Sequence, residues 1–194
     1  IALANQFLLE KKWLKSEYPL SKKFSGTKFG ILGMGRIGKT IAKRIESFNC
    51  EICYHSRNQK DVKYKYFSKL EDLAEYVDTL CVITPGGEET KHLVNANVLQ
   101  KLGKNGFLIN IARGTVIDQK ALIYALQNNI IRGAGLDVFE NEPNVPDDLI
   151  SLNNVILTPH IGSATVETRY DMGKLVYDNI VQMLTTNTTI SPVN

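Results

Sequence analysis

One glycine-rich turn constrains the fold of this chain more than any other feature. The apolar run at residues 29–32 leads into GMGRIG at residues 33–38, and residues 37–48 then carry apolar side chains at helical spacing. A G-x-G-x-x-G pattern is weak by itself, but between a buried strand and a helix it is typical of a dinucleotide-binding turn. We therefore expect dinucleotide phosphates to bind here, through Gly33, Gly35, Arg36, Ile37 and Gly38.

Each glycine of this motif has a separate expected role. Gly33 permits the tight turn, Gly35 lets the backbone approach the pyrophosphate, and Gly38 lets the helix pack closely on the strand. The start of the helix then offers free N–H groups and a partial positive charge to the phosphates.

Helix and strand signals alternate along the rest of the chain. We expect strands at residues 29–32, 51–54, 79–83, 107–111, 133–138 and 155–157. We expect helices at residues 1–14, 37–48, 70–76, 118–128 and 166–184, with Asp118 as an N-cap. This alternation indicates an α/β fold, a Rossmann-type doubly wound parallel sheet with helices on both faces. The ligand crevice of such a sheet lies at the carboxyl ends of its strands.

The residues after the second expected strand bear on the choice of cofactor. A domain that binds NAD usually has an acidic residue there, which holds the ribose 2′-hydroxyl. Here the segment is His55-Ser56-Arg57-Asn58, without Asp or Glu. Ser56 can donate to a 2′-phosphate and Arg57 can pair with it in bidentate fashion. We expect a preference for NADP(H); the alternative is that Arg57 is only a surface charge and NAD(H) is also bound.

Three residues suited to keto-acid chemistry follow later strands. Arg113 follows the fourth, Glu142 the fifth and His160 the sixth. A histidine can deliver a proton to a developing alkoxide near neutral pH, and a neighbouring carboxylate favours its charged form. An arginine can hold a substrate carboxylate and polarise the adjacent carbonyl. Each residue alone could be structural, but together, beside a dinucleotide motif, they favour hydride transfer between the cofactor and a 2-keto or 2-hydroxy acid.

Further contacts to the cofactor are expected from the same strand ends. They come from Thr84, Pro85, Ile111, Ala112, Arg113, Asp137, His160 and Gly162. We also expect a hydrogen bond between the side chains of Glu142 and His160, because both follow strands of one sheet.

The composition argues against several other classes of protein. The chain has 194 residues, of which 43% are hydrophobic and 22% charged, and a formal net charge of +3. It has neither the clustered basic face of a nucleic-acid binder nor an apolar run that could span a membrane, and a cytoplasmic location follows by default. We expect Cys50, Cys53 and Cys81 to be buried thiols and expect no metal site.

With these motifs, residues 24–163 resemble the D-isomer-specific 2-hydroxyacid dehydrogenases. The resemblance rests on GMGRIG at 33–38, NIARG at 110–114, GAGLDVFENEP at 133–143 and TPHIGS at 158–163. It implies that Arg113, Glu142 and His160 are the catalytic set and that Asp137 lies near the nicotinamide. Within the family the chain is most similar to the glyoxylate/hydroxypyruvate reductases, including the plant hydroxyphenylpyruvate type, which use NADPH.

The resemblance also implies a domain organisation. Residues 1–23 match an inter-domain helix and connector, 24–163 the dinucleotide-binding domain, and 164–194 a C-terminal helix that returns toward a substrate domain. Family members build most of that substrate domain from residues further upstream, so we expect part of the substrate site to lie outside this sequence. The first helix, with Leu3, Phe7, Leu8 and Trp13, lies in the dimer contact of the family, and we expect a homodimer.

Two other functions stay open on the sequence alone. One is an NAD-linked dehydrogenase of another 2-hydroxy acid, such as phosphoglycerate or lactate. The other is a dinucleotide-sensing protein like the C-terminal binding protein corepressors, which share the fold. Ser56 and Arg57 weigh against an NAD sensor, and turnover by the intact protein would separate the two classes.

Overall fold

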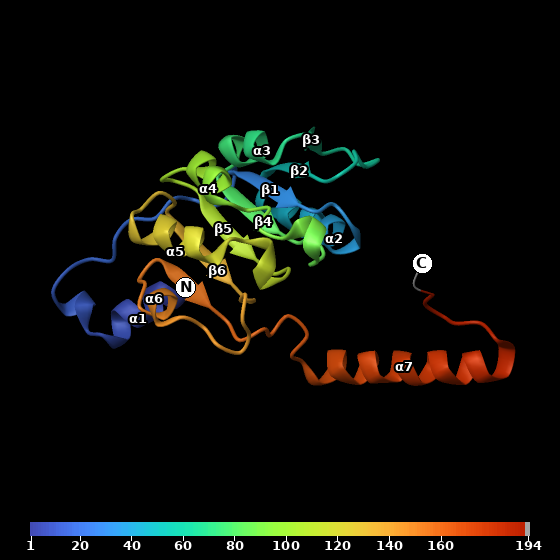
Figure 1. The fold of residues 1–194 in the computed structure, drawn as a ribbon. Helices are drawn as coiled ribbons and strands as arrows, with labels where there is room; N and C mark the ends of the chain where they lie inside the picture. The colour runs from blue at the N-terminus through green and yellow to red at the C-terminus, as the bar shows by residue number, and fades with distance from the viewer. Residues whose placement is uncertain (193–194) are drawn as a thin grey trace. The chain divides into compact units, whose positions relative to one another are not determined.

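A sheet of seven parallel strands organises the first 159 residues (Figure 1). The strands are β1 (Lys28–Leu32), β2 (Glu51–His55), β3 (Lys65–Phe67), β4 (Thr79–Val82), β5 (Phe107–Asn110), β6 (Gly133–Leu136) and β7 (Val155–Leu157). Their order across the sheet is β3-β2-β1-β4-β5-β6-β7, so the direction of winding reverses between β1 and β4. In a doubly wound sheet this reversal opens a crevice at the carboxyl ends of the strands. The expected Rossmann-type fold is confirmed.

Seven α-helices accompany the strands in the part of the chain that the structure describes, residues 1–192. They are α1 (Ala2–Leu9), α2 (Arg36–Ile45), α3 (Leu70–Tyr76), α4 (Ala96–Leu102), α5 (Gln119–Gln127), α6 (Asp147–Ile150) and α7 (Val166–Thr186). The chain divides into two compact units, residues 1–159 and the residues from His160 onward, and α7 belongs to the second. The boundary expected after residue 163 stays a prediction.

Side chains on opposite faces of the sheet form two separate cores. Successive residues of a strand point to opposite faces, so Ile31 packs with Ala42 of α2 while Leu32 packs with Leu73 of α3. The core that contains Leu32 is the larger of the two, because it also includes apolar residues of α4 and α5. The sheet therefore has a packed core on each of its faces.

The structure corrects several expected boundaries. The first helix ends at Leu9, not at residue 14, because Lys11 adopts a left-handed backbone (φ 56°) and a short 3₁₀ turn follows. The second ends at Ile45 and gives way to a 3₁₀ turn, Glu46–Phe48. Strand β3 and helices α4 and α6 were not expected from the sequence. Asp118 is confirmed as an N-cap, since its carboxylate accepts a hydrogen bond from the Ala121 N–H at 3.0 Å.

The cysteines are free thiols in two different environments. Burial raises the pKa of Cys81 to about 12, and burial with the nearby Glu51 carboxylate raises that of Cys53 to about 11. Both are therefore protonated and inert near neutral pH. Cys50 is partly exposed, so the expectation of three buried thiols was wrong for this residue.

Helix α7 is the main element of the second unit. It is 21 residues long, and the hydroxyl of its N-cap Thr165 accepts a hydrogen bond from the Thr168 N–H. Among residues 1–192 no helix is both long and apolar enough to cross a membrane.

Candidate functional site

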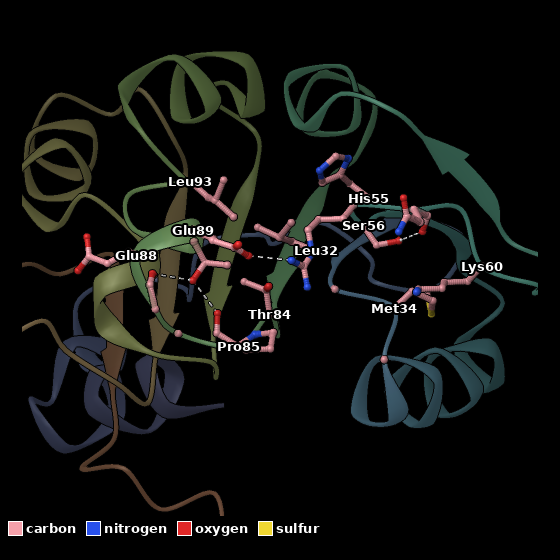
Figure 2. Close-up of a pocket in the computed structure, with 17 residues that line it drawn as sticks. Leu32, Met34, His55, Ser56, Lys60, Thr84, Pro85, Glu88, Glu89 and Leu93 are labelled. Carbon is pink, nitrogen blue, oxygen red and sulfur yellow. Dashed lines mark hydrogen bonds and ion pairs between the residues drawn. The ribbon is translucent and has the colours of Figure 1, made fainter. Parts of the chain in front are cut away.

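A cavity of about 690 Å³ opens at the carboxyl ends of β1, β2 and β4 (Figure 2). This is the place where the winding of the sheet reverses. Six of the residues expected to bind cofactor line it: Gly33, Gly35, Ser56, Arg57, Thr84 and Pro85. The volume lies within the range of small-molecule sites, so the cavity is a suitable place for a dinucleotide.

The glycine turn between β1 and α2 forms one wall of the cavity. Gly33 has a φ of 108°, a conformation that a residue with a Cβ rarely adopts. A Cβ on Gly38 would overlap the carbonyl oxygen of Gly33, so this glycine is needed for the close packing of helix on strand. A Cβ on Gly35 would meet nothing within 4 Å. The protein itself therefore does not explain Gly35, whereas a bound pyrophosphate would.

Helix α2 begins within the glycine turn. The helix begins at Arg36, and its N-cap, Gly35, has no side chain with which to satisfy the first N–H groups. Such groups bind phosphate through hydrogen bonds and the partial positive charge of the helix end. Arg36, Ile37 and Gly38 form the first turn, and Ile37 is 61% exposed. The residues of this wall thus fit a dinucleotide phosphate.

The segment after β2 also lines the cavity. Arg57 is exposed and lines the cavity, and the Ser56 hydroxyl donates a hydrogen bond to the Asn58 carbonyl at 2.7 Å. Lys60 also lines the cavity, and its backbone N–H donates a hydrogen bond to the hydroxyl of the buried Tyr54 at 2.8 Å. This second cation was not expected from the sequence, because it lies further along the loop than Ser56 and Arg57.

An ion pair joins the two loops that border this part of the cavity. Arg57 Nη1 lies 2.7 Å from Glu89 Oε2, and the side chains are 86% and 79% exposed. Glu89 belongs to a 3₁₀ turn, Glu88–Thr90, in the loop after β4. Figure 2 shows its carboxylate on the side of the turn that faces Ser56, whereas the carboxylate of Glu88 points away. Sequence reasoning missed Glu89, because 32 residues separate it from its partner.

Arg113 follows β5 in a turn that Asn110 holds in place. The buried Asn110 side chain accepts a hydrogen bond from the Ala112 N–H at 3.0 Å and donates to the Arg113 carbonyl at 3.1 Å. A Cβ on Gly86 would lie 2.8 Å from Arg113 Cγ, so the stem of Arg113 lies against the loop that lines the cavity. The structure therefore brings Arg113 to the edge of the cavity. Ile111 and Ala112 lie in the same turn, and Ala112 is buried.

The loops after β5 and β6 pack closely against each other. A Cβ on Gly114 would overlap the backbone of Phe139 and Glu140. The ring nitrogen Nε2 of His92 lies 2.7 Å from Glu140 Oε1. The backbone N–H of His92 donates a hydrogen bond to the Thr115 carbonyl at 2.9 Å. His92 therefore joins three loops, those after β4, β5 and β6. Its role was not visible in the sequence, because the contacts are distant along the chain.

Glu142 and Asp137 lie at the end of β6. One carboxylate oxygen of Glu142 accepts a hydrogen bond from the Phe139 N–H at 3.0 Å, which fixes the residue within its loop. Asp137 is buried, accepts from the Thr158 hydroxyl at 2.6 Å and donates its N–H to the Asn110 carbonyl at 3.0 Å. Asp137 therefore connects the ends of three neighbouring strands.

His160 and Gly162 follow β7 along the chain and belong to the second unit. His160 has a φ of 51°, in the left-handed region that few residues other than glycine adopt. Such conformations are enriched at functional sites. The expected hydrogen bond between His160 and Glu142 stays a prediction. Among residues 1–192 no group of three or more metal-ligating side chains was found.

Comparisons with known proteins agree with this architecture. Residues 1–162 match the family model for the D-isomer specific 2-hydroxyacid dehydrogenase, NAD binding domain. The chain is 47% identical over 190 residues to glyoxylate/hydroxypyruvate reductase A of Arabidopsis thaliana, covering 97% of this chain and 61% of the relative. It is 42% identical over 194 residues to hydroxyphenylpyruvate reductase of Plectranthus scutellarioides, covering 100% and 62%.

A solved structure shows the same likeness in three dimensions. The NADPH-dependent glyoxylate/hydroxypyruvate reductase of Sinorhizobium meliloti, in complex with NADP and malonate, superposes with a TM-score of 0.92 at 47% identity. The likeness covers 98% of this chain and 60% of that one, so the chain spans about three fifths of the proteins it matches. From its motifs, its sheet and these similarities, the chain belongs to the D-isomer specific 2-hydroxyacid dehydrogenase family, of which it carries the NAD-binding domain.

Proposed function

We propose that this chain is the dinucleotide-binding part of a reductase that transfers hydride from NADPH to a small 2-keto acid such as glyoxylate or hydroxypyruvate. One observation carries the proposal: the glycine turn and the Ser56–Arg57 segment line the same cavity, and no Asp or Glu stands at residues 56–60, directly after β2. An arginine and a hydroxyl suit a 2′-phosphate, whereas a carboxylate in that position would repel it. NADH remains a second possible cofactor of the same site.

The proposed binding residues divide between the two ends of the cofactor. The glycine turn, with Arg36 and Ile37, holds the pyrophosphate, and Ser56, Arg57 and Lys60 meet the 2′-phosphate. Thr84, Pro85, Ile111, Ala112, Asp137 and Gly162 complete the contacts toward the nicotinamide. When bound, the cofactor supplies the hydride.

The proposed catalytic residues then act on the keto acid. Arg113 holds its carboxylate and polarises the carbonyl, because a guanidinium matches a carboxylate in geometry and charge. His160 donates the proton that the developing alkoxide requires, and Glu142 stabilises the charged imidazole. The support is the position of all three after neighbouring strands of one parallel sheet.

The choice of cofactor can be tested by calorimetric titration of the intact protein. We expect NADPH to bind roughly tenfold to a hundredfold more tightly than NADH, because a charge-assisted pair contributes ~1.5–3 kcal/mol. Arg57→Ala should remove most of this difference. Arg44→Ala, which removes an exposed arginine from the last turn of α2, is the matched control and should leave the difference intact. Equal affinities in the wild-type protein would contradict the preference.

The catalytic roles can be tested by steady-state kinetics of keto-acid reduction with the intact protein. Glu142→Gln should lower kcat, because the charge that stabilises the imidazolium is gone. His160→Ala should remove most turnover with little effect on NADPH binding. An unchanged kcat in the Gln variant would remove Glu142 from the proposed role.

We further propose that the intact protein is a homodimer in the cytoplasm. The support is an apolar concavity of about 520 Å³ lined by Leu3 of α1 and by sheet residues such as Ile109 and Ile156. Leu8 and Trp13 are also 52% and 68% exposed. Burial of this surface by a second copy would remove apolar area from water. Sedimentation of the intact protein as a single chain at tens of micromolar would contradict the dimer. The cytoplasmic location is tested separately, by cell fractionation.

A further inference from the structure

Glu89 places a negative charge beside the residue that defines the cofactor preference. Its Oε2 lies 2.7 Å from Arg57 Nη1, and both side chains line the cavity. Any phosphate that Arg57 held would therefore meet Glu89 as a competitor for the same guanidinium. A carboxylate and a phosphate around one cation repel each other, and the repulsion is greatest when the phosphate is doubly charged.

The turn that carries Glu89 is held in place by other contacts. The Thr90 hydroxyl donates to the Pro85 carbonyl at 2.7 Å and lies 3.1 Å from the Gly87 carbonyl. The Thr90 N–H also donates to the Gly87 carbonyl at 3.1 Å. The backbone of Glu89 is therefore set beside the cavity independently of its ion pair. The side chain is 79% exposed, so it can leave Arg57 at little cost.

We propose that Glu89 is a specificity-determining residue, which competes with the 2′-phosphate of NADPH for Arg57 and so limits the preference for NADPH over NADH. This inference rests on the proposed function, in which Arg57 binds that phosphate. NADH has a 2′-hydroxyl instead, which can donate a hydrogen bond to a carboxylate. Glu89 thus supplies, from the loop after β4, an acid of the kind that NAD-binding domains usually have after β2. It weakens NADPH binding without weakening that of NADH.

The chain offers a matched control for this test. Glu88 precedes Glu89 in the same 3₁₀ turn and lines the same cavity, but its carboxylate points away from Ser56 (Figure 2). Glu88→Gln and Glu89→Gln therefore make the same change in net charge at neighbouring positions. A general electrostatic effect would appear in both variants, whereas competition for Arg57 would appear only in the second.

The experiment is calorimetric titration of NADPH and NADH into the intact wild-type protein, Glu88→Gln, Glu89→Gln, Arg57→Ala and the double variant Arg57→Ala/Glu89→Gln. We expect Glu89→Gln to tighten NADPH binding about three- to tenfold, with NADH binding equal or weaker. Glu88→Gln should change either affinity by less than about twofold. In the Arg57→Ala background the effect of Glu89→Gln on NADPH should shrink, because the shared cation is absent.

A second probe separates the phosphate from the rest of the cofactor. Adenosine 2′-monophosphate should gain affinity in Glu89→Gln, and adenosine 5′-monophosphate should not. The inference is overturned if NADPH affinity in Glu89→Gln is unchanged or weaker, or if Glu88→Gln gives the same gain. If Arg57→Ala leaves NADPH affinity unchanged, the proposed phosphate site and the inference both fail. If Arg57→Ala weakens NADPH but Glu89→Gln does nothing, only the inference fails.

Discussion

The two halves of the carboxyl edge of the sheet are built in different ways. Around β1, β2 and β4, a glycine turn and two exposed loops border an open cavity, and the ion pair between the loops is more than three quarters exposed. Around β5 and β6, the loops pack directly on each other, and the His92–Glu140 pair that ties the β6 loop to the loop after β4 is only 41% and 28% exposed. The first half is therefore open and joined by an exposed ion pair, whereas the loops of the second half pack directly on each other.

In the proposed function, this difference separates the needs of cofactor binding from those of catalysis. A phosphate is recognised by N–H groups and charge, so an open and adaptable half is sufficient for it. A keto acid must be held within a fraction of an ångström of its reacting partners, which requires loops that do not move. Substitutions in the first half should therefore change affinity, and substitutions in the second should change stability and turnover.

The largest effect on stability is expected at Gly114, where the loops after β5 and β6 pack most closely. Gly114→Ala places a Cβ on the backbone of Phe139 and Glu140, neither of which can move without opening the β6 loop. We expect the free energy of unfolding to fall by ~3 kcal/mol or more, measured by urea denaturation. Gly135→Ala in β6, where a Cβ would meet nothing within 4 Å, is the control and should be nearly neutral. Equal stability of the two variants would contradict the close packing.

Gly35→Ala should show the opposite behaviour in the first half. The added Cβ meets nothing within 4 Å, so thermal unfolding should stay close to that of the wild-type protein. NADPH binding should weaken about tenfold or more, which corresponds to ~1.4 kcal/mol, because the methyl group lies where the pyrophosphate approaches. Gly38→Ala is the counterpart, since its Cβ overlaps the Gly33 carbonyl and should reduce stability as well. Unchanged NADPH affinity in Gly35→Ala would place the pyrophosphate elsewhere.

The Arg57–Glu89 and His92–Glu140 pairs should differ in coupling energy. A double-mutant cycle of His92→Ala with Glu140→Ala should give ~1–2 kcal/mol of coupling in urea denaturation, because the pair is partly desolvated. His92→Ala should also lower keto-acid turnover of the intact protein while NADPH affinity stays unchanged, because the loop that carries Glu142 loses a support. Turnover equal to wild type would show that the pair does not position this loop.

The smallest effect should come from the exposed pair. Arg57→Ala should change the free energy of unfolding by less than about 0.5 kcal/mol, because salt and water screen a pair that is 86% and 79% exposed. The same variant is expected to lose most of its preference for NADPH. A loss of stability as large as the coupling of ~1–2 kcal/mol expected for the His92–Glu140 pair would show that the two halves are not built differently.

Local patterns in the sequence predicted most of the sheet. Six of the seven strands were expected at the right places, because buried parallel strands are short apolar runs between helical segments. The edge strand β3 is only three residues long and partly buried, so it leaves no apolar run to detect. Helix α4 did leave signals that were overlooked, Asn95 at its N-cap and Gly103 at its C-cap.

The sequence by itself determined the Rossmann-type fold, the family, and the order in which glycine turn, Ser56–Arg57 segment, Arg113, Glu142 and His160 occur. These follow from residue types at short spacing, which are visible along the chain. The tertiary structure alone decided that Glu89 faces Arg57, that His92 binds Glu140, and that Asn110 holds the turn of Arg113. The two side-chain contacts join residues that are 32 and 48 positions apart, so only the packing of parallel strands brings them to one edge. Asn110 lies three residues from Arg113, but its hydrogen bonds depend on burial that the tertiary fold creates.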